Sequence, residues 1–256
     1  MSKKDLKSFL DEKASTYNTT DFIESDPISI PHQFKKKQDI EISGFLSATI
    51  AWGQRPTIIK NANKLMDWMD NDPHQFVVNA SEKELGIFQN FVHRTFNGDD
   101  CQFFIYSLQQ MYKTFDSLED IFAPDIAKES QDTSLFISNF RDTFFSEPHL
   151  ARTQKHVSNP IKGSSAKRLN MMLRWFCRQD DKGVDFGIWN KIKPYQLVCP
   201  LDVHTGNVGR KLGLLTRKQN DWKAAIELTN NLKKFDATDP IRYDFALFGL
   251  GVFENF

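Results

Sequence analysis

The chain has 256 residues, 40% of them hydrophobic and 23 of them Phe, and it carries 33 Lys plus Arg against 33 Asp plus Glu. This composition supports a sizeable core in one large domain or two small lobes, and the zero net charge excludes a general attraction to polyanions, so that such a site must come from local patterning. Three cysteines without paired spacing argue against a disulfide framework and against a four-cysteine metal or iron–sulfur site.

Two helices are expected near the start of the chain, because apolar residues recur at helical spacing on either side of Gly53 and Pro56. The first stripe comprises Ile42, Phe45, Leu46, Thr49 and Ile50. The second comprises Ile58, Ile59, Ala62, Leu65, Met66 and Met69. The glycine and the proline place the break between the helices near Trp52–Pro56.

The middle of the chain predicts two more helices. One carries Phe88, Phe91 and Val92, and the next carries Phe103, Phe104, Leu108 and Met111. Asn97-Gly98-Asp99 lies between them and is typical of a turn followed by a helix N-cap.

Three helices are predicted after residue 160. The first has Leu169, Met172, Leu173 and Phe176 on one face, the second has Val208, Leu212 and Leu215, and the last has Ile241, Phe245, Phe248 and Val252 after an Asp239-Pro240 start signal. Alternation typical of strands is scarce, so the sequence predicts an all-α protein.

Charge is uneven along the chain. Residues 151–178 contain no acid and seven basic residues, namely Arg152, Lys155, Lys162, Lys167, Arg168, Arg174 and Arg178. Residues 116–132 contain six acids and one Lys. A neutral protein can present one strongly basic face, but the same pattern fits an ordinary solvated helix surface.

Two residues have features that suggest chemistry. Asp202 follows Pro200-Leu201 at the start of a predicted helix, which is typical of an N-cap and holds the carboxylate in one place. Lys167 lies opposite the Leu169–Phe176 stripe, on the same side as Arg174 and Arg178, so we do not expect it in the core. The alternatives are that Asp202 is a cap alone and that Lys167 is an ordinary solvated lysine.

The segments "GSSAKRLNMML" and "PLDVHTGNVGRKLGL" together resemble the helix–hairpin–helix DNA glycosylase superfamily, which includes endonuclease III and the archaeal 8-oxoguanine glycosylases. The resemblance implies an all-α, two-lobed fold with a helix–hairpin–helix motif and a cleft between lobes. It also implies that Lys167 is the catalytic lysine and Asp202 the catalytic aspartate, while His204, Val208, Arg210, Leu212 and Gly213 fit the second signature.

The segment "DIEISGFLSATIAWGQRPTIIKNANKLM" resembles the early helix pair of the superfamily, whose connecting loop probes the opened duplex. Trp52, Gly53, Gln54 and Arg55 fall in that loop, and either Trp52 or Gln54 takes the probe position. The resemblance implies a set of DNA-binding residues: Lys162, Gly163, Ser164, Ser165, Arg168, Arg174, His204, Arg210, Trp52, Gln54 and Arg55.

The sequence departs from the superfamily pattern in three places. Ser165 replaces the second hairpin glycine, which bears on how closely the backbone can approach a phosphate. The 35 residues from Lys167 to Asp202 include Gly183 and Gly187, which suggest an inserted turn and short helix, and the cysteine cluster of endonuclease III is absent. The chain is also similar to an uncharacterised bacterial family placed in this superfamily, so membership does not determine an activity.

The expected architecture is a single glycosylase-like unit over residues 1–256, with one lobe at about 38–180 and the other at about 1–37 plus 181–256. We expect a cytoplasmic protein, because the free thiols suit a reducing compartment and the chain lacks a secretory signal and a bilayer-spanning run. We also expect a monomer. It would need no cofactor or metal, and its partner would be double-stranded DNA with a damaged base, 8-oxoguanine being one candidate.

Base excision requires the base to leave the stack, and a neutral lysine amine can attack C1′. Lys162, Arg168 and Arg174 would supply the cationic surroundings that favour a neutral Lys167, and Asp202 would assist its deprotonation. We therefore expect Lys167 and Asp202 to converge across the cleft, with their side-chain tips within roughly 10 Å of each other.

Two other hypotheses stay open. One is a non-catalytic DNA-binding protein that retains the fold and the basic face. The other is a metal site built from Cys199, Asp202 and His204.

Overall fold

Every regular element in the described residues is helical, so the all-α class that the sequence predicts is confirmed. The structure is a computed structural model that describes residues 2–125 and 130–256. The extended pairings within these ranges are two isolated bridges, His93 with Phe96 and Ser164 with Asp221. Within the same ranges, no helix combines the length and the apolar character needed to cross a bilayer.

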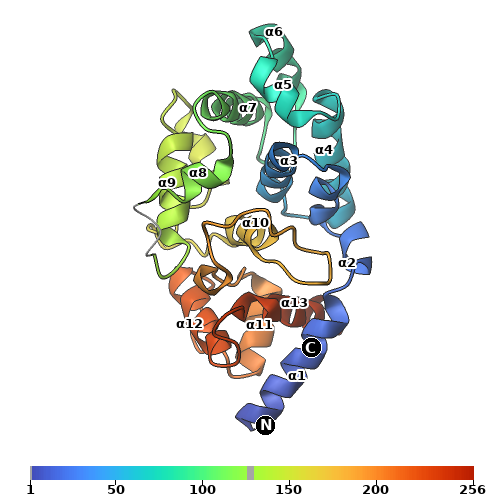
Figure 1. Cartoon of the computed structure of the whole chain (residues 1–256), viewed down its shortest axis with the longest axis vertical. Helices are drawn as coiled ribbons and strands as arrows, with labels where there is room; N and C mark the ends of the chain where they lie inside the picture. Colours follow the sequence, from blue (N-terminus) through green and yellow to red (C-terminus); the bar gives the residue numbers. More distant parts are fainter. Residues whose placement is uncertain (1, 126–129) are drawn as a thin grey trace. The chain divides into compact units, whose positions relative to one another are not determined.

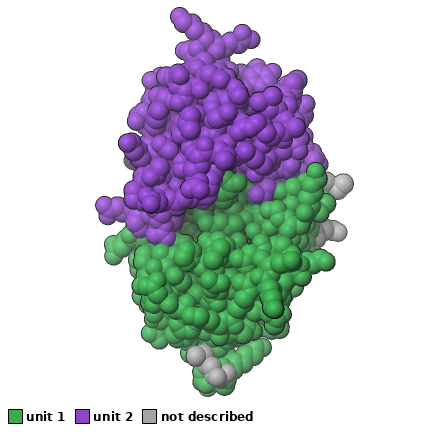
Figure 2. All heavy atoms as spheres, turned by 180° about the vertical axis from the view of Figure 1, so that it is seen from behind, with its two compact units in different colours: residues 1–22, 129–135, 159–256 green, residues 23–128, 136–158 purple. Residues whose placement is uncertain are grey.

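The chain divides into two units (Figure 2). Unit 1 comprises residues 1–22, 129–135 and 159–256, and unit 2 comprises residues 23–128 and 136–158. These units differ from the lobes expected from the sequence, which are about 38–180 and 1–37 plus 181–256. Residues 159–180 lie in unit 1 because they bond to its C-terminal helices, for example through the Trp222 amide and the Gly163 carbonyl (2.9 Å).

Unit 2 holds most of the helices from the first half of the chain (Figure 1). Their bounds are η1 Pro27–Ser29, η2 Pro31–Gln33, α3 Lys37–Thr49, α4 Arg55–Trp68, α5 Pro73–Asn79, α6 Glu82–Leu85, η3 Gly86–Asn90, α7 Gly98–Tyr112, α8 Leu118–Phe122, α9 Ser134–Phe144 and η5 Ala151–His156. The short helix α2 Asp21–Glu24 and the start of α9 fall at the boundary between the units.

Phenylalanine rings fill the core of unit 2. The Phe45 ring on α3 lies 5.6 Å from that of Phe104 on α7, and 5.1 and 5.4 Å from those of Phe140 and Phe144 on α9. All four side chains are fully buried, and aromatic pairs at such separations add to the gain from burial. The high Phe content of the sequence therefore has a structural role here.

Most expectations for unit 2 are confirmed. Helices α3 and α4 flank a break at residues 50–54, and the Asn97 side chain caps α7 through the Asp100 amide. The helix predicted around Phe88 is wrong beyond Asn90, because Phe91 is extended and His93 pairs with Phe96 in a narrow turn.

Unit 1 is built from the N-terminal helix and the C-terminal third of the chain (Figure 1). Its elements are α1 Lys3–Tyr17, α10 Lys167–Cys177, η6 Pro194–Gln196, α11 Val203–Lys211, α12 Trp222–Lys233, η7 Pro240–Tyr243 and α13 Asp244–Val252. Helices α1 and α13 pack together, and the Tyr17 ring stacks on that of Phe253 at 5.5 Å.

Two sequence expectations for unit 1 are corrected. The helix after Asp202 does not continue to Leu215, because Gly213 adopts a φ of 71° and ends it. The short helix expected around Gly183 and Gly187 is absent from the described residues. Instead, this segment is an irregular loop whose Phe186 amide donates to the Trp175 carbonyl near the end of α10 (2.7 Å), so it caps that helix.

Candidate functional site

The segment that leads into Lys167 forms a tight turn. The Gly163 amide donates to the Pro160 carbonyl (2.8 Å), and the Ser164 amide donates to the Asn159 carbonyl (3.2 Å). Gly163 has a φ of 88°, a conformation that favours glycine because it has no Cβ. Helix α10 begins at Lys167, while the element before the turn in the chain is the 3-10 helix η5.

Asp202 is the N-cap of α11, as the sequence predicts. Its Oδ1 accepts a hydrogen bond from the Thr205 amide at 3.0 Å, which satisfies one of the free donors at the helix start. Its other oxygen, Oδ2, is left to face Lys167. One carboxylate therefore has two separate partners.

Lys167 and Asp202 lie together despite the 35 residues between them. The distance from Lys167 Nζ to Asp202 Oδ2 is 3.4 Å, and the side chains are 28% and 24% exposed. The expectation that their tips would lie within roughly 10 Å is confirmed, but the expectation that they face each other across two lobes is wrong, because both residues belong to unit 1. Lys167 is the first residue of α10 and Asp202 caps α11, so the backbone of each is fixed by a helix. Because about a quarter of each side chain is exposed, a ligand can reach the pair.

Ser165 joins the two segments that carry this pair. Its hydroxyl donates to the Leu201 carbonyl at 3.4 Å, directly before Asp202 in the chain. A glycine at this position could not make the bond. The serine thus adds a link between the turn and the aspartate cap.

Arg174 is buried, and its expected place on a solvent-exposed basic face is wrong. Its side chain is 4% exposed, with Nε 3.2 Å from Asp185 Oδ1 and Nη1 2.6 Å from Asp244 Oδ2. A guanidinium that is held by two buried carboxylates does not contact a phosphate. The charge of Arg174 is also neutralised, so it does not add to the cationic surroundings expected for Lys167.

Asp244 lies behind the Lys167–Asp202 pair at the start of α13. Burial raises the pKa of Asp244 to about 6, although the neighbouring Arg174 acts in the opposite direction. The Cys199 thiol lies 3.9 Å from Asp244 Oδ1, and burial, with Asp244 next in effect, raises the pKa of that thiol. These groups form a buried polar layer next to the partly exposed pair.

Arg178 extends this layer and is buried as well. It contacts Asp180 at 2.7 Å, Asp185 at 3.0 Å and Asp239 at 2.9 Å. Burial lowers the pKa of Arg178, but the three aspartates outweigh burial and raise it overall. Burial also raises the pKa of Asp239 despite the adjacent arginine.

Sequence reasoning missed Asp185 and Asp244 as partners of the arginines. Asp244 is 70 positions from Arg174, so local spacing gives no signal for the pair. The one available hint is the pair of arginines, Arg174 and Arg178, which lie within and directly after residues 171–177, a segment that is otherwise apolar. Such a helix needs acidic partners if it is buried.

The remaining hairpin and α11 predictions have mixed outcomes. Lys162 is exposed, and burial lowers the pKa of the half-buried Arg168 to about 10. Ser164 bridges to Asp221. The exposed His204 packs its Cβ against Gly251, and Arg210 holds a neighbouring loop rather than pointing freely outward. The structure places Lys162, Gly163, Ser164 and Ser165 at the turn before Lys167.

The predicted duplex-probing residues belong to unit 2. Trp52 is half-buried, with its ring 4.9 Å from that of His93 and 5.9 Å from that of His156. Gln54 is exposed at the N-cap of α4 and makes no capping bond there, and Arg55 is the first residue of that helix. Gln54 is thus the more accessible of the two candidate probe residues.

The alternative metal site is not supported by the geometry. Cys199 is fully buried and faces Asp244, whereas His204 is exposed. In residues 2–125 and 130–256, no three His, Cys, Asp or Glu side chains are grouped to hold a metal ion. The hypothesis that Cys199, Asp202 and His204 share a metal is therefore wrong.

Comparisons with known proteins give one match. No curated protein and no solved structure matches the chain. The family model described as "Protein of unknown function (DUF2400)" matches residues 26–253, which include the turn, Lys167, Asp202 and the buried polar layer. Since this match covers most of the 256 residues, the chain belongs to the DUF2400 family.

Proposed function

We propose that the protein is a DNA base-excision glycosylase with abasic-site lyase activity, acting on a flipped damaged base. Lys167 is the nucleophile in this proposal, and Asp202 is its carboxylate partner. The observation that carries it is the 3.4 Å distance between Lys167 Nζ and Asp202 Oδ2 at an accessible surface. Base excision would take place in unit 1.

The covalent step uses these two groups. The neutral amine of Lys167 forms a bond to C1′ as the N-glycosidic bond breaks, and the base leaves with the bonding electrons and takes a proton. Asp202 accepts a proton from the attacking nitrogen and stabilises positive charge on the sugar. Opening of the sugar ring then gives a Schiff base. Loss of a proton from C2′ eliminates the 3′ phosphate, and water then hydrolyses the Schiff base and releases the Lys167 amine.

The position of Lys167 supports a functional role. A cation at the start of a helix opposes the helix dipole by about 0.3–1 kcal/mol. An ion pair near the surface stabilises the fold by about 0–1 kcal/mol. The two effects nearly cancel, so stability does not explain why a lysine occupies this position. A nucleophile, in contrast, needs this placement beside a carboxylate.

A non-catalytic DNA-binding protein is the second candidate. The observation that favours it is the same ion pair, since a lysine that stays charged beside Asp202 can neutralise a phosphate but cannot attack C1′. The two candidates differ in whether a covalent adduct forms.

The experiment is adduct trapping. The protein is incubated with duplexes that carry 8-oxoguanine, uracil, thymine glycol or an abasic site, and borohydride is added to reduce any Schiff base to a stable amine. We expect an adduct with at least one duplex, and none with Lys167→Gln. The matched control is Lys4→Gln, which removes an exposed lysine from α1.

Two outcomes would contradict the proposal. Absence of adducts with all four duplexes, combined with measurable DNA binding, would favour the non-catalytic candidate. Adducts that form with Lys167→Gln at the parental rate would assign the nucleophile to another amine, such as that of Lys162 or the N-terminus.

A further inference from the structure

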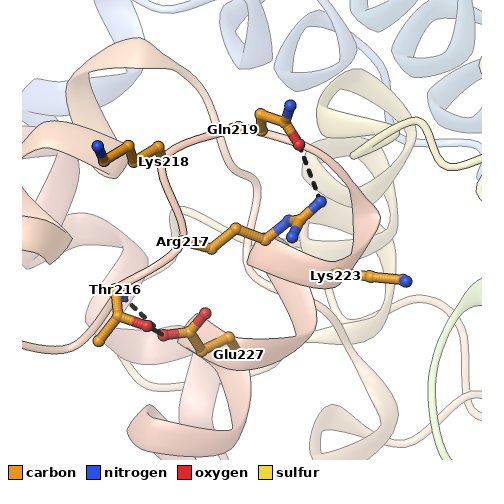
Figure 3. A pocket seen from close by; sticks show the side chains of 6 residues that line it. All are labelled: Thr216, Arg217, Lys218, Gln219, Lys223 and Glu227. Atoms are coloured by element: carbon orange, nitrogen blue, oxygen red, sulfur yellow. Dashed lines mark hydrogen bonds between the residues drawn. The ribbon is translucent and has the colours of Figure 1, made fainter.

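The segment between α11 and the first turn of α12 carries three basic residues, Arg217, Lys218 and Lys223, within residues 216–223. We refer to residues 216–223 as the basic loop. Sequence reasoning assigned no role to it. Its side chains line a surface pocket of about 540 Å³, shown in Figure 3, together with Glu227 of α12.

Arg210 fixes the basic loop to α11. Its Nε donates to the Arg217 carbonyl at 2.9 Å, and its Nη2 donates to the Lys218 carbonyl at 2.9 Å and to Asn220 Oδ1 at 2.6 Å. Gly206 makes this approach possible, because a Cβ there would lie 2.7 Å from Asn220 Oδ1. The arginine expected to contact DNA therefore organises a loop that carries other cations.

The far end of the basic loop is fixed to the candidate site. The Asn220 amide group donates to the Asp202 carbonyl at 3.0 Å. Asp221 bridges to Ser164 of the turn, and the next amide in the chain, that of Trp222, donates to the Gly163 carbonyl at 2.9 Å. The loop thus borders both the turn before Lys167 and the aspartate cap.

Within the loop, two of the cations are available and one is engaged. Arg217 is paired with Asp221, and Glu227 accepts from both the amide and the hydroxyl of Thr216. Lys218 and Lys223 are exposed. Lys223 adds to the lowering of the Asp221 pKa, which is due first to Arg217, but it is Arg217 and not Lys223 that forms the ion pair with that carboxylate. In Figure 3 their side chains extend outward from the loop on either side of Arg217.

We infer that the basic loop binds backbone phosphates of the nucleic acid strand held at Lys167 and Asp202, with Lys218 and Lys223 as the contacting residues. The inference rests on the proposed function, and it names a phosphate-binding surface in addition to the turn at Gly163. A fixed loop that presents two exposed cations beside the site is suited to this contact, because phosphate contacts set the position of a strand without reading its sequence.

The test is the dependence of duplex affinity on salt concentration, measured by fluorescence anisotropy with an abasic-site duplex. Affinity falls as salt rises, and each lost phosphate contact reduces the steepness of log affinity against log salt by about 0.9. We expect Lys218→Gln/Lys223→Gln to lower the slope by about 1.8, because it removes two contacts. Lys3→Gln/Lys4→Gln makes the same charge change at exposed positions of α1 and should leave the slope unchanged.

The outcomes separate the inference from the proposed function. If the parental protein binds the duplex and gives trapped adducts, but the loop variant keeps the parental slope, the inference is wrong and the proposed function stands. An equal drop in slope for the α1 control would also overturn it, because the effect would then be one of total charge. A parental protein that does not bind the duplex contradicts both.

Discussion

Substitution of Arg174 by Met tests the buried polar layer. Arg174→Met removes the cation next to Asp185 and Asp244 but keeps an unbranched side chain in the core. Asp185 retains Arg178 at 3.0 Å, whereas Asp244, with 6% of its side chain exposed, loses its ion-pair partner. Breaking a buried ion pair on one side typically costs about 3–5 kcal/mol of unfolding free energy, which is the loss we expect at pH 8.

The loss should shrink as the pH falls. The pKa of Asp244 in the folded protein is about 6, against an ordinary 3.8, so the protonated form is favoured by folding. The stability that the protonated Asp244 carboxyl contributes is fully present below pH 3.8 and is lost as the pH rises through about 6. Without Arg174 the pKa of this carboxyl rises further, so the variant should be destabilised less at pH 5 than at pH 8.

Urea unfolding at pH 5 and pH 8 measures both effects, with fluorescence of the buried Trp175 and Trp189 as the signal. Adding Asp244→Asn to Arg174→Met should recover part of the stability at pH 8, because no unpaired charge is then buried. A loss below about 1 kcal/mol that is equal at both pH values would refute the reasoning, since exposed arginines behave in that way.

Substitutions at four further positions test the site, with urea unfolding as the measure of stability. Gly206→Ala should cost no more than about 1 kcal/mol, because its Cβ would meet only the ends of the Asn220 and Arg210 side chains, at 2.7 and 2.9 Å, and these can shift. Gly209→Ala, whose Cβ would lie at ordinary distances of 3.4 and 3.5 Å from its neighbours, should be neutral or stabilising by up to about 1 kcal/mol. Ala166 has a φ of 46° and is buried, so Ala166→Val should cost more than about 2 kcal/mol while Ala166→Gly stays within about 1 kcal/mol of the parent. Asp202→Ala should cost about 1 kcal/mol by removing the cap, and Asp202→Asn should keep that stability but lose trapped adducts.

Local signals account for the features that the sequence predicted correctly. The caps at Asn97 and Asp202 depend on side chains that reach the amide three residues on, and the break between α3 and α4 follows from Gly53 and Pro56. Such information is contained within a few residues of the chain. The starts of these helices could therefore be predicted from the sequence alone.

The burial of α10 could not be predicted in this way. A helical wheel places Arg174 and Arg178 opposite the apolar stripe and so assigns them to solvent. In the structure every residue of α10 from Leu169 to Cys177 is buried, and the arginines meet acids from other segments. The partners of a buried charge depend on tertiary contacts, which the spacing of one helix does not contain.

The closeness of Lys167 and Asp202 is a consequence of the fold rather than of their attraction. Their ion pair is about a quarter exposed on each side, and a pair of that kind contributes about 0–1 kcal/mol, too little to position two helices. The buried side of α10 holds the backbone of Lys167, while the cap bond to Thr205 and the Ser165 link hold that of Asp202. The two groups are therefore in place before a substrate binds. Because they are preorganised, none of the binding energy of the substrate is needed to bring them together.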